Sequence, residues 1–161
     1  MITEAEVFQV TLNRNVSENL LKPTMIDAAF QQWLVDYIGA DFVQEILDAD
    51  SYSGDTIYSG ITETYLKPII AWGVIYNNFE YISTNITDKG VIQMLIEGTA
   101  NLIGRDGRLD AKFELRNTIY QLIKSFDRYC KLKEFENYKG LRLTPSFPKF
   151  YGRKRVNLHP Y

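Results

Sequence analysis

The chain has 161 residues, of which 18 are Lys or Arg and 20 are Asp or Glu, so its formal net charge is −2. This length suits a single domain that buries roughly 70% of its unfolded surface. A composition of 45% apolar and 24% charged residues excludes disordered and collagen-like chains.

The first predicted helix covers residues 3–10. Thr3 is placed to cap it, and Glu6 follows three residues later, which is the spacing of a capping box. Residues 13–22 are polar and rich in Asn, so they predict a loop or a loose turn.

Two further helices are predicted in the next part of the chain. The first begins with a cap at Thr24, has Asp27 three residues further on, and ends at Gly39. Its apolar positions recur at helical spacing: Ile26, Ala29, Phe30, Trp33 and Tyr37. A short helix then starts at Asp41, with an apolar stripe of Phe42, Val43, Ile46 and Leu47. Residues 48–60 are rich in Asp, Ser and Gly, and they predict a surface loop.

The most apolar segment, residues 61–83, predicts a helix that is contacted on most sides. One face carries Tyr65, Ile69, Trp72, Tyr76 and Phe79, and a second carries Leu66, Ile70, Val74 and Ile75. Because Pro68 falls within this pattern, the helix either begins there, with proline in its first turn, or bends there. Residues 85–90 predict a turn, and residues 91–103 predict either a helix or an extended arm. Trp33 and Trp72 are expected in the core.

The longest helix is predicted over residues 109–135. Its apolar stripe is Leu115, Ile119, Leu122, Phe126 and Tyr129, and most of its basic residues lie outside that stripe: Arg116, Lys124, Arg128, Lys131 and Lys133. Gly140 marks a break, and the prolines at 145, 148 and 160 prevent a continuous helix beyond it. The predicted fold is therefore mostly α: a small bundle of four to five helices with an extended C-terminal arm.

The sequence lacks the features of a membrane protein and of a secreted protein. No apolar run reaches the roughly 20 residues that span a bilayer. Residues 1–10 contain no base of a secretory signal, and Cys130 alone cannot form an internal disulfide. We therefore expect synthesis in a reducing cytoplasm, no membrane partner, and a Cys130 that is packed rather than reactive.

Most enzyme chemistry is disfavoured in the same way. The lone histidine, His159, excludes a multi-histidine metal site, and residues 104–108 lack the P-loop pattern. Asp106, Asp110 and Glu114 could form a carboxylate or metal cluster, but acids at a helix start are also favoured by the helix dipole. We interpret them as a solvated helix start, and we expect a protein that is not an enzyme.

Charge divides the chain into two parts. Residues 139–161 contain six bases and no acid, a net charge of +6, so residues 1–138 have 12 bases, 20 acids and a net charge of −8. We predict an acidic helical bundle domain over residues 1–138 and a basic, aromatic, proline-spaced arm over residues 139–161.

Several strings define the layout of the chain: Met1-Ile2-Thr3-Glu4, Trp33-Leu34, Ile38-Gly39, the segment from Tyr65 to Trp72, Thr87-Asp88-Lys89-Gly90-Val91, and Arg128-Tyr129-Cys130. In helix order and loop position, most of residues 1–135 resembles the head-to-tail connector (adaptor) proteins of tailed bacteriophages. These are small helical proteins that form a ring beneath the portal.

The resemblance implies a structural virion protein at the head–tail junction, which is made in the bacterial host cytoplasm and needs no cofactor. It implies a homo-oligomeric ring, usually of twelve copies, which extends the channel between the portal protein and the tail or stopper ring proteins. Double-stranded DNA would pass through this ring without specific binding during ejection. An acidic body suits such passage, because basic walls would bind every phosphate that they neutralise.

The C-terminal arm is the predicted partner-binding region, since family members hold the portal with this segment. Proline stiffens an extended segment, which then loses less entropy on docking, and aromatic and arginine side chains often dominate interface energy. The predicted contacts are Phe147, Phe150 and Tyr151 between subunits, and Arg153, Lys154 and Arg155 on an acidic surface of the portal or a neighbouring subunit.

Four alternatives stay open at this point. The basic arm could fold back onto its own acidic body, or it could bind a nucleic acid strand by charge and stacking. The chain could be a small helical phage or bacterial interaction or regulatory protein that binds one partner through its tail. It could also be an enzyme that uses carboxylates, for which a metal-dependent change in stability would be the sign.

Overall fold

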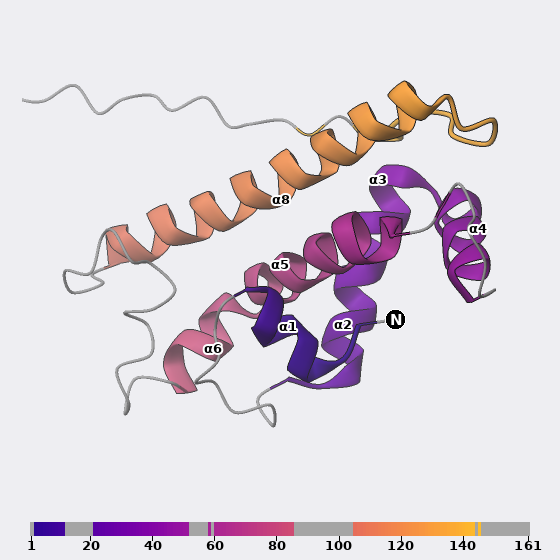
Figure 1. Cartoon of the computed structure of the whole chain (residues 1–161). Coiled ribbons are helices and arrows are strands. Elements are labelled where there is room, and N and C mark those ends of the chain that lie inside the picture. The colour runs from indigo at the N-terminus through magenta and orange to yellow at the C-terminus, as the bar shows by residue number, and fades with distance from the viewer. Residues whose placement is uncertain are drawn as a thin grey trace, which may run out of the picture.

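A computed structural model describes residues 2–11, 21–51, 58, 60–85, 105–143 and 145 of the chain. Within these ranges the chain forms six helices and no strand, so the predicted mostly α-helical class is confirmed. Most of the predicted loop 13–22 and of the turn 85–90, and all of the segment 91–103, lie outside the described residues. Figure 1 shows the arrangement of the helices.

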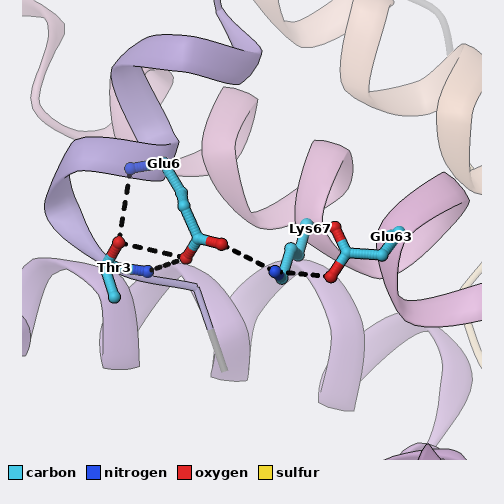
Figure 2. A network of polar contacts seen from close by, with 4 residues as sticks. All are labelled: Thr3, Glu6, Glu63 and Lys67. Carbon is cyan, nitrogen blue, oxygen red and sulfur yellow. Dashed lines mark hydrogen bonds and ion pairs between the residues drawn. The ribbon is translucent and has the colours of Figure 1, made fainter.

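Helix α1 covers Glu4–Val10 and has the predicted capping box: the Thr3 hydroxyl accepts from the Glu6 N–H at 3.3 Å, and the Glu6 carboxylate accepts from the Thr3 N–H at 2.7 Å. Glu6 also binds Lys67 Nζ at 2.7 Å, and Lys67 binds Glu63 at 2.6 Å, as Figure 2 shows. This network fastens α1 to the helix that lies at the centre of the body.

One long helix is built from α2 (Pro23–Phe30), a wide π-helical turn (Gln31–Val35) and α3 (Asp36–Ile38). The predicted cap at Thr24 is wrong, because the helix starts at Pro23 and the cap position is occupied by Lys22, two residues earlier. Proline is favoured in the first turn of a helix, because a backbone N–H at that position would have no hydrogen-bond partner within the helix. The predicted end at Gly39 is confirmed, since its φ of +108° suits glycine.

Helix α4 (Ala40–Ser51) follows directly after Gly39. Its predicted apolar stripe is confirmed, with Phe42, Val43 and Ile46 buried and Leu47 half-buried. The predicted loop 48–60 is wrong at its start, because α4 continues to Ser51. The helix therefore includes residues 48–51, although their Asp and Ser composition predicts a loop.

The apolar segment forms two helices rather than one. A π-helical turn (Thr62–Leu66) leads directly into α5 (Lys67–Asn77). Pro68 therefore lies in the first turn of α5, but helical structure begins before it. A turn at Asn78 then separates α5 from α6 (Phe79–Asn85), and this division raises the number of helices above the four to five predicted. The Asn78 side chain donates to the C=O of Val74 at 2.8 Å, which competes with continued helix.

Helix α5 lies at the centre of the body, with α8 on one side and α1 and α2 on the other (Figure 1). Its buried residues are Ile69, Ile70, Ala71, Gly73, Val74 and Ile75. Gly73 permits the close approach of the α2–α3 helix, because a Cβ at this position would collide with the Trp33 indole. Trp33 is 3% exposed, as predicted for a core residue, whereas Trp72 is only half-buried against the core.

Helix α8 (Arg105–Lys133) is the longest and covers α5 with one face. Its fully buried positions are Ile119, Ile123, Phe126 and Cys130, whereas the predicted core residue Leu122 is only half-buried. The predicted bounds of 109–135 are shifted, because the helix starts four residues earlier and ends two residues earlier. Among the described residues, none of the helices is long and apolar enough to cross a membrane.

Candidate partner-binding interface

The six residues predicted to bind a partner, Phe147, Phe150, Tyr151, Arg153, Lys154 and Arg155, lie outside the described residues. The structure does describe the chain that leads to them, namely residues 134–143 and Pro145. We call this part the return segment, because it turns back from the end of α8 and reaches the carbonyl of Tyr37 in α3. Its contacts fix the position of the chain just before the predicted binding residues.

The return segment begins with a Schellman motif at the end of α8. The N–H of Glu134 donates to the C=O of Lys131 at 3.3 Å, and the N–H of Phe135 donates to the C=O of Cys130 at 3.4 Å. Glu134 has a φ of +52°, a conformation that glycine normally adopts at this position. This motif reverses the chain, so that Phe135 is buried on the body rather than continuing the helix.

Aromatic rings attach the return segment to the end of the body. Phe135 stacks on Tyr58 with ring centroids 5.1 Å apart. Phe135 and Tyr138 both contact Phe42 of α4, with centroids at 5.9 Å and 5.0 Å. Leu141 also packs against the core. Aromatic pairs of this kind contribute about 0.5–1.5 kcal/mol each beyond their burial.

A carboxylate of α8 holds Tyr138 in place. The Tyr138 hydroxyl donates to Asp127 Oδ1 at 2.7 Å, and Lys131 Nζ binds Asp127 Oδ2 at 2.7 Å. Burial, and then the hydrogen bond to Asp127, raise the pKa of Tyr138 well above its ordinary value of 10. The phenol therefore keeps its proton, and this hydrogen bond persists across the physiological pH range.

Glu45 of α4 makes a second polar attachment. Its carboxylate accepts hydrogen bonds from the Tyr58 hydroxyl and from Asn137 Nδ2, the latter at 3.1 Å. Burial and the bond to Glu45 raise the pKa of Tyr58 to about 12. Asn137 thus joins the return segment to α4 through a side chain that also fixes Tyr58.

Arg142 makes the attachment furthest along the return segment. Its backbone N–H donates to the C=O of Tyr37 at 2.8 Å, and its side chain lies over Gly39. A Cβ at Gly39 would come within 2.8 Å of Arg142 Nε, which this flexible side chain can relieve by moving, so glycine is needed there for its positive φ. Pro145, three residues later, is buried.

A half-open groove of about 410 Å³ lies between the return segment and the junction of α3 and α4. Two acids, Asp41 and Glu45, and two bases, Lys139 and Arg142, line it together with apolar atoms. Charged side chains of both signs suit polar contacts with a peptide segment.

Of the three carboxylates that we considered for catalysis, the structure describes the side chains of two. Asp110 and Glu114 are exposed on α8, and the side chain of Asp106 lies outside the described residues. No group of three or more His, Cys, Asp or Glu within the described part of the chain could hold a metal ion. Cys130 is buried, and this burial raises the pKa of its thiol to about 12, so the residue is packed rather than reactive.

The sequence pattern does not predict that the return segment is attached to the body. The predicted helix runs through Glu134 to Phe135, because a glutamate at a left-handed position gives no local signal of a helix end. Phe135, Tyr138 and Leu141 recur at steps of three beyond this end, and this apolar spacing was the available signal. No protein-family model, curated protein or solved structure gave a significant match to the chain.

Proposed function

We propose that this protein is a structural subunit of a bacteriophage head–tail connector. Copies of the chain form a ring, of about twelve subunits in the family that it resembles, between the portal protein and the tail or stopper ring proteins. The acidic bodies line or surround a channel for double-stranded DNA, and the basic aromatic tail holds the portal or a neighbouring subunit. The protein acts as a virion component rather than as an enzyme.

The observation that carries this proposal is the attachment of the return segment. Arg142 and Tyr138 fasten the chain to the helical body, and Pro145 is buried, immediately before the basic and aromatic residues of the predicted arm. An arm that starts from a fixed point loses less freedom on binding than one that starts from a free end. The attachment therefore supports a role in which each subunit presents its tail to a partner at a defined position.

Charge supports the same proposal. Residues 1–138 have a net charge of −8, and residues 146–161, beyond the return segment, contain four bases and no acid. A body of this charge repels DNA and adds no phosphate contacts that would slow its passage. The bases of the tail suit an acidic surface on another protein subunit, where charge complementarity speeds and orients docking.

The test is native mass spectrometry of three proteins, each alone and after co-expression with the portal protein of the same phage. These are the full chain, a chain ending at Pro145, and a full-length Phe147→Ala/Phe150→Ala/Tyr151→Ala variant. Truncation after Pro145 keeps every described residue, so circular dichroism should match the full chain. We expect rings on the portal for the full chain, and their loss for both variants.

Other outcomes decide against the proposal. Rings that form equally well without residues 146–161 contradict the role of the tail. A tight dimer that does not bind the portal contradicts the connector function and favours the small interaction protein. The attachment of Arg142 to Tyr37 supports that second candidate too, because a fixed tail base also suits a compact protein that binds a single partner.

A further inference from the structure

Residues 131–139, where α8 ends and the return segment begins, have the composition of a helix. They contain no Gly or Pro, and strong helix formers (Lys, Leu and Glu) occupy six of the nine positions. Glu136 precedes Lys139 by three residues, a spacing that allows an ion pair on a helix. Gly140 is the first glycine after Gly107, and glycine is the usual residue just after a helix end. The local sequence therefore favours a helix that continues to Gly140.

The structure instead ends α8 at Lys133, and this end is locally unfavourable. Glu134 has a φ of +52°, a left-handed conformation that any side chain with a Cβ disfavours. The two hydrogen bonds of the Schellman motif, from the N–H groups of Glu134 and Phe135, measure 3.3 Å and 3.4 Å, and the usual distance is about 2.9–3.0 Å. The end of α8 is therefore held by the tertiary contacts of Phe135 and Tyr138.

A longer α8 would pair backbone groups that the return segment leaves unpaired. No backbone hydrogen bond between residues that the structure describes uses the N–H of Glu136, Asn137 or Lys139. In a continued helix each of these groups donates to the C=O four residues earlier. Adding residues to an existing helix needs no new nucleation, which is the costly step of helix formation. The helical form of residues 134–139 is therefore a close competitor of the observed form.

The longer helix would also carry an apolar and basic stripe. Arg128, Leu132, Phe135 and Lys139 follow one another at steps of four, three and four, which is the spacing of one helix face. In the described structure Leu132 is 81% exposed, and Phe135 is turned away from it into the body. Aromatic and arginine side chains are enriched at protein interfaces. Only the helical form brings Phe135 beside Leu132 on one face that a neighbouring subunit can cover.

We propose that residues 134–139 are a conformational switch, which forms the return segment in the free chain and continues α8 in the assembled connector. This inference rests on the proposed connector function and deepens it. Six further helical residues lengthen α8 by about 9 Å and move the base of the tail by a similar distance. The tail starts from a fixed point in both states, namely the attachment of Arg142 in the free chain and the end of a rigid helix in the ring.

The contacts of the return segment explain why the free chain keeps the closed form. Phe135 is buried against Phe42 and Tyr58, so release of the segment exposes apolar rings on both sides of this contact. In a ring, neighbouring subunits can cover these rings and the stripe of the longer helix. Assembly then favours the helical form, because a partner shifts an equilibrium towards the state that it binds better.

The first test is Glu136→Pro, which is compatible with the return segment and incompatible with a helix. Glu136 is the second residue of a turn closed by a 3.1 Å hydrogen bond from the N–H of Tyr138 to the C=O of Phe135. Among the described residues Glu134 alone has a positive φ without being glycine, so both central residues of this turn have negative φ, as in a type I turn. Proline is favoured at the second position of such a turn, whereas it breaks a helix interior.

We expect Glu136→Pro to keep the urea stability of the wild type and to weaken ring assembly on the portal protein at least about tenfold, measured by native mass spectrometry. The matched control is Glu136→Ala, which removes the same charge and permits a helix. This control should assemble like the wild type.

The second test uses the full chain alone. The variant Tyr138→Ala/Leu141→Ala removes two attachments of the return segment and keeps the buried residues of α5. We expect hydrogen exchange at the N–H groups of Asn137 and Lys139 to slow at least about tenfold relative to the wild type, because the released residues join α8. Adding Glu136→Pro to this variant should abolish the protection. Circular dichroism checks that the other helices stay folded.

The outcomes separate this inference from the proposed function. If Glu136→Pro and Glu136→Ala assemble equally well on the portal, the switch is not used and the inference is wrong, while the connector function stands. Amides of Asn137 and Lys139 that stay unprotected in the released variant also contradict the helical form. A wild type that forms no ring on the portal contradicts the proposed function, and the exchange experiment then decides separately whether residues 134–139 can join α8.

Discussion

Helix α5 and the return segment differ greatly in how much contact they make with the rest of the molecule. Six residues of α5 are buried, and α1, α2 and α8 all pack against it. The return segment is attached by the rings of Phe135 and Tyr138, by Leu141, and by hydrogen bonds from Asn137, Tyr138 and Arg142. Regions with few buried contacts open locally at lower free energy than the whole domain.

This difference separates two properties of the molecule. The packing around α5 determines whether the body folds, whereas the attachments of the return segment determine where the tail leaves the body. We therefore expect the return segment to detach at a lower free energy than the helices unfold. Changes in each region should affect stability to different extents and should be detected by different measurements.

The largest effect is expected for Ile69→Ala in α5. Ile69 is fully buried at the centre of the body, and replacement of such a residue by alanine removes apolar contacts and leaves a cavity. We expect a loss of about 2–5 kcal/mol in the free energy of unfolding, measured by urea denaturation. Leu141→Ala is the matched change in the return segment, and it should cost less than half as much. Equal losses would show that the two regions unfold together.

Tyr138→Phe tests the return segment directly. It removes the hydrogen bond to Asp127 and keeps the ring contacts, so we expect a local loss of about 1–2 kcal/mol. Hydrogen exchange should reveal this loss at the N–H of Arg142, which is bound to Tyr37, with little change at the amides of α5. If both sets of amides change equally, local opening of the return segment is excluded.

The sequence predicted the elements whose signals are local or repeated. The capping box of Thr3 and Glu6 needs only neighbouring residues, the end at Gly39 needs only glycine, and the burial of α5 follows from its apolar composition. The six predicted partner-binding residues lie beyond the described residues, and they stay a prediction. The described part of the candidate site is the return segment, which leads to these six residues.

The return segment could not be predicted because its conformation depends on distant contacts. Glu134 adopts a left-handed conformation that its own side chain disfavours, and the burial of Phe135 against Phe42 and Tyr58 compensates for it. These partners are more than 70 residues away in the sequence.

A smaller effect is expected for the network that fastens α1 to α5. Hydrogen bonds from Lys67, and then from the N–H of Thr3, lower the pKa of Glu6 from 4.5 to about 2. Because the folded-state pKa is the lower one, Glu6 stabilises the protein above pH 4.5, and this contribution is lost as the pH falls towards 2. Glu6 is one-third exposed, so solvent screening limits the contribution to about 1 kcal/mol.

The variant Lys67→Met removes the largest part of this contribution, together with the ion pair to the more exposed Glu63. Other carboxylates titrate in the same range, so the informative quantity is the difference in unfolding free energy between wild type and variant, measured by urea denaturation at several pH values. We expect this difference to be largest near neutral pH and to shrink between pH 4.5 and 2. A difference that is independent of pH would mean that Lys67 acts only through packing of its alkyl chain.

The smallest effect is expected for Glu134→Gly, and it should stabilise the protein. Glycine removes the strain of a side chain at a φ of +52°, about 1–2 kcal/mol, but it also adds freedom to the unfolded chain, which offsets about 0.4–1 kcal/mol. A net gain of about 0.5 kcal/mol in urea denaturation is therefore expected. Glu134→Ala removes the charge and keeps the strain, so it should give no such gain. If alanine stabilises as much as glycine, the acid near the negative end of the α8 dipole is the cause, and the left-handed backbone of Glu134 is not a source of strain.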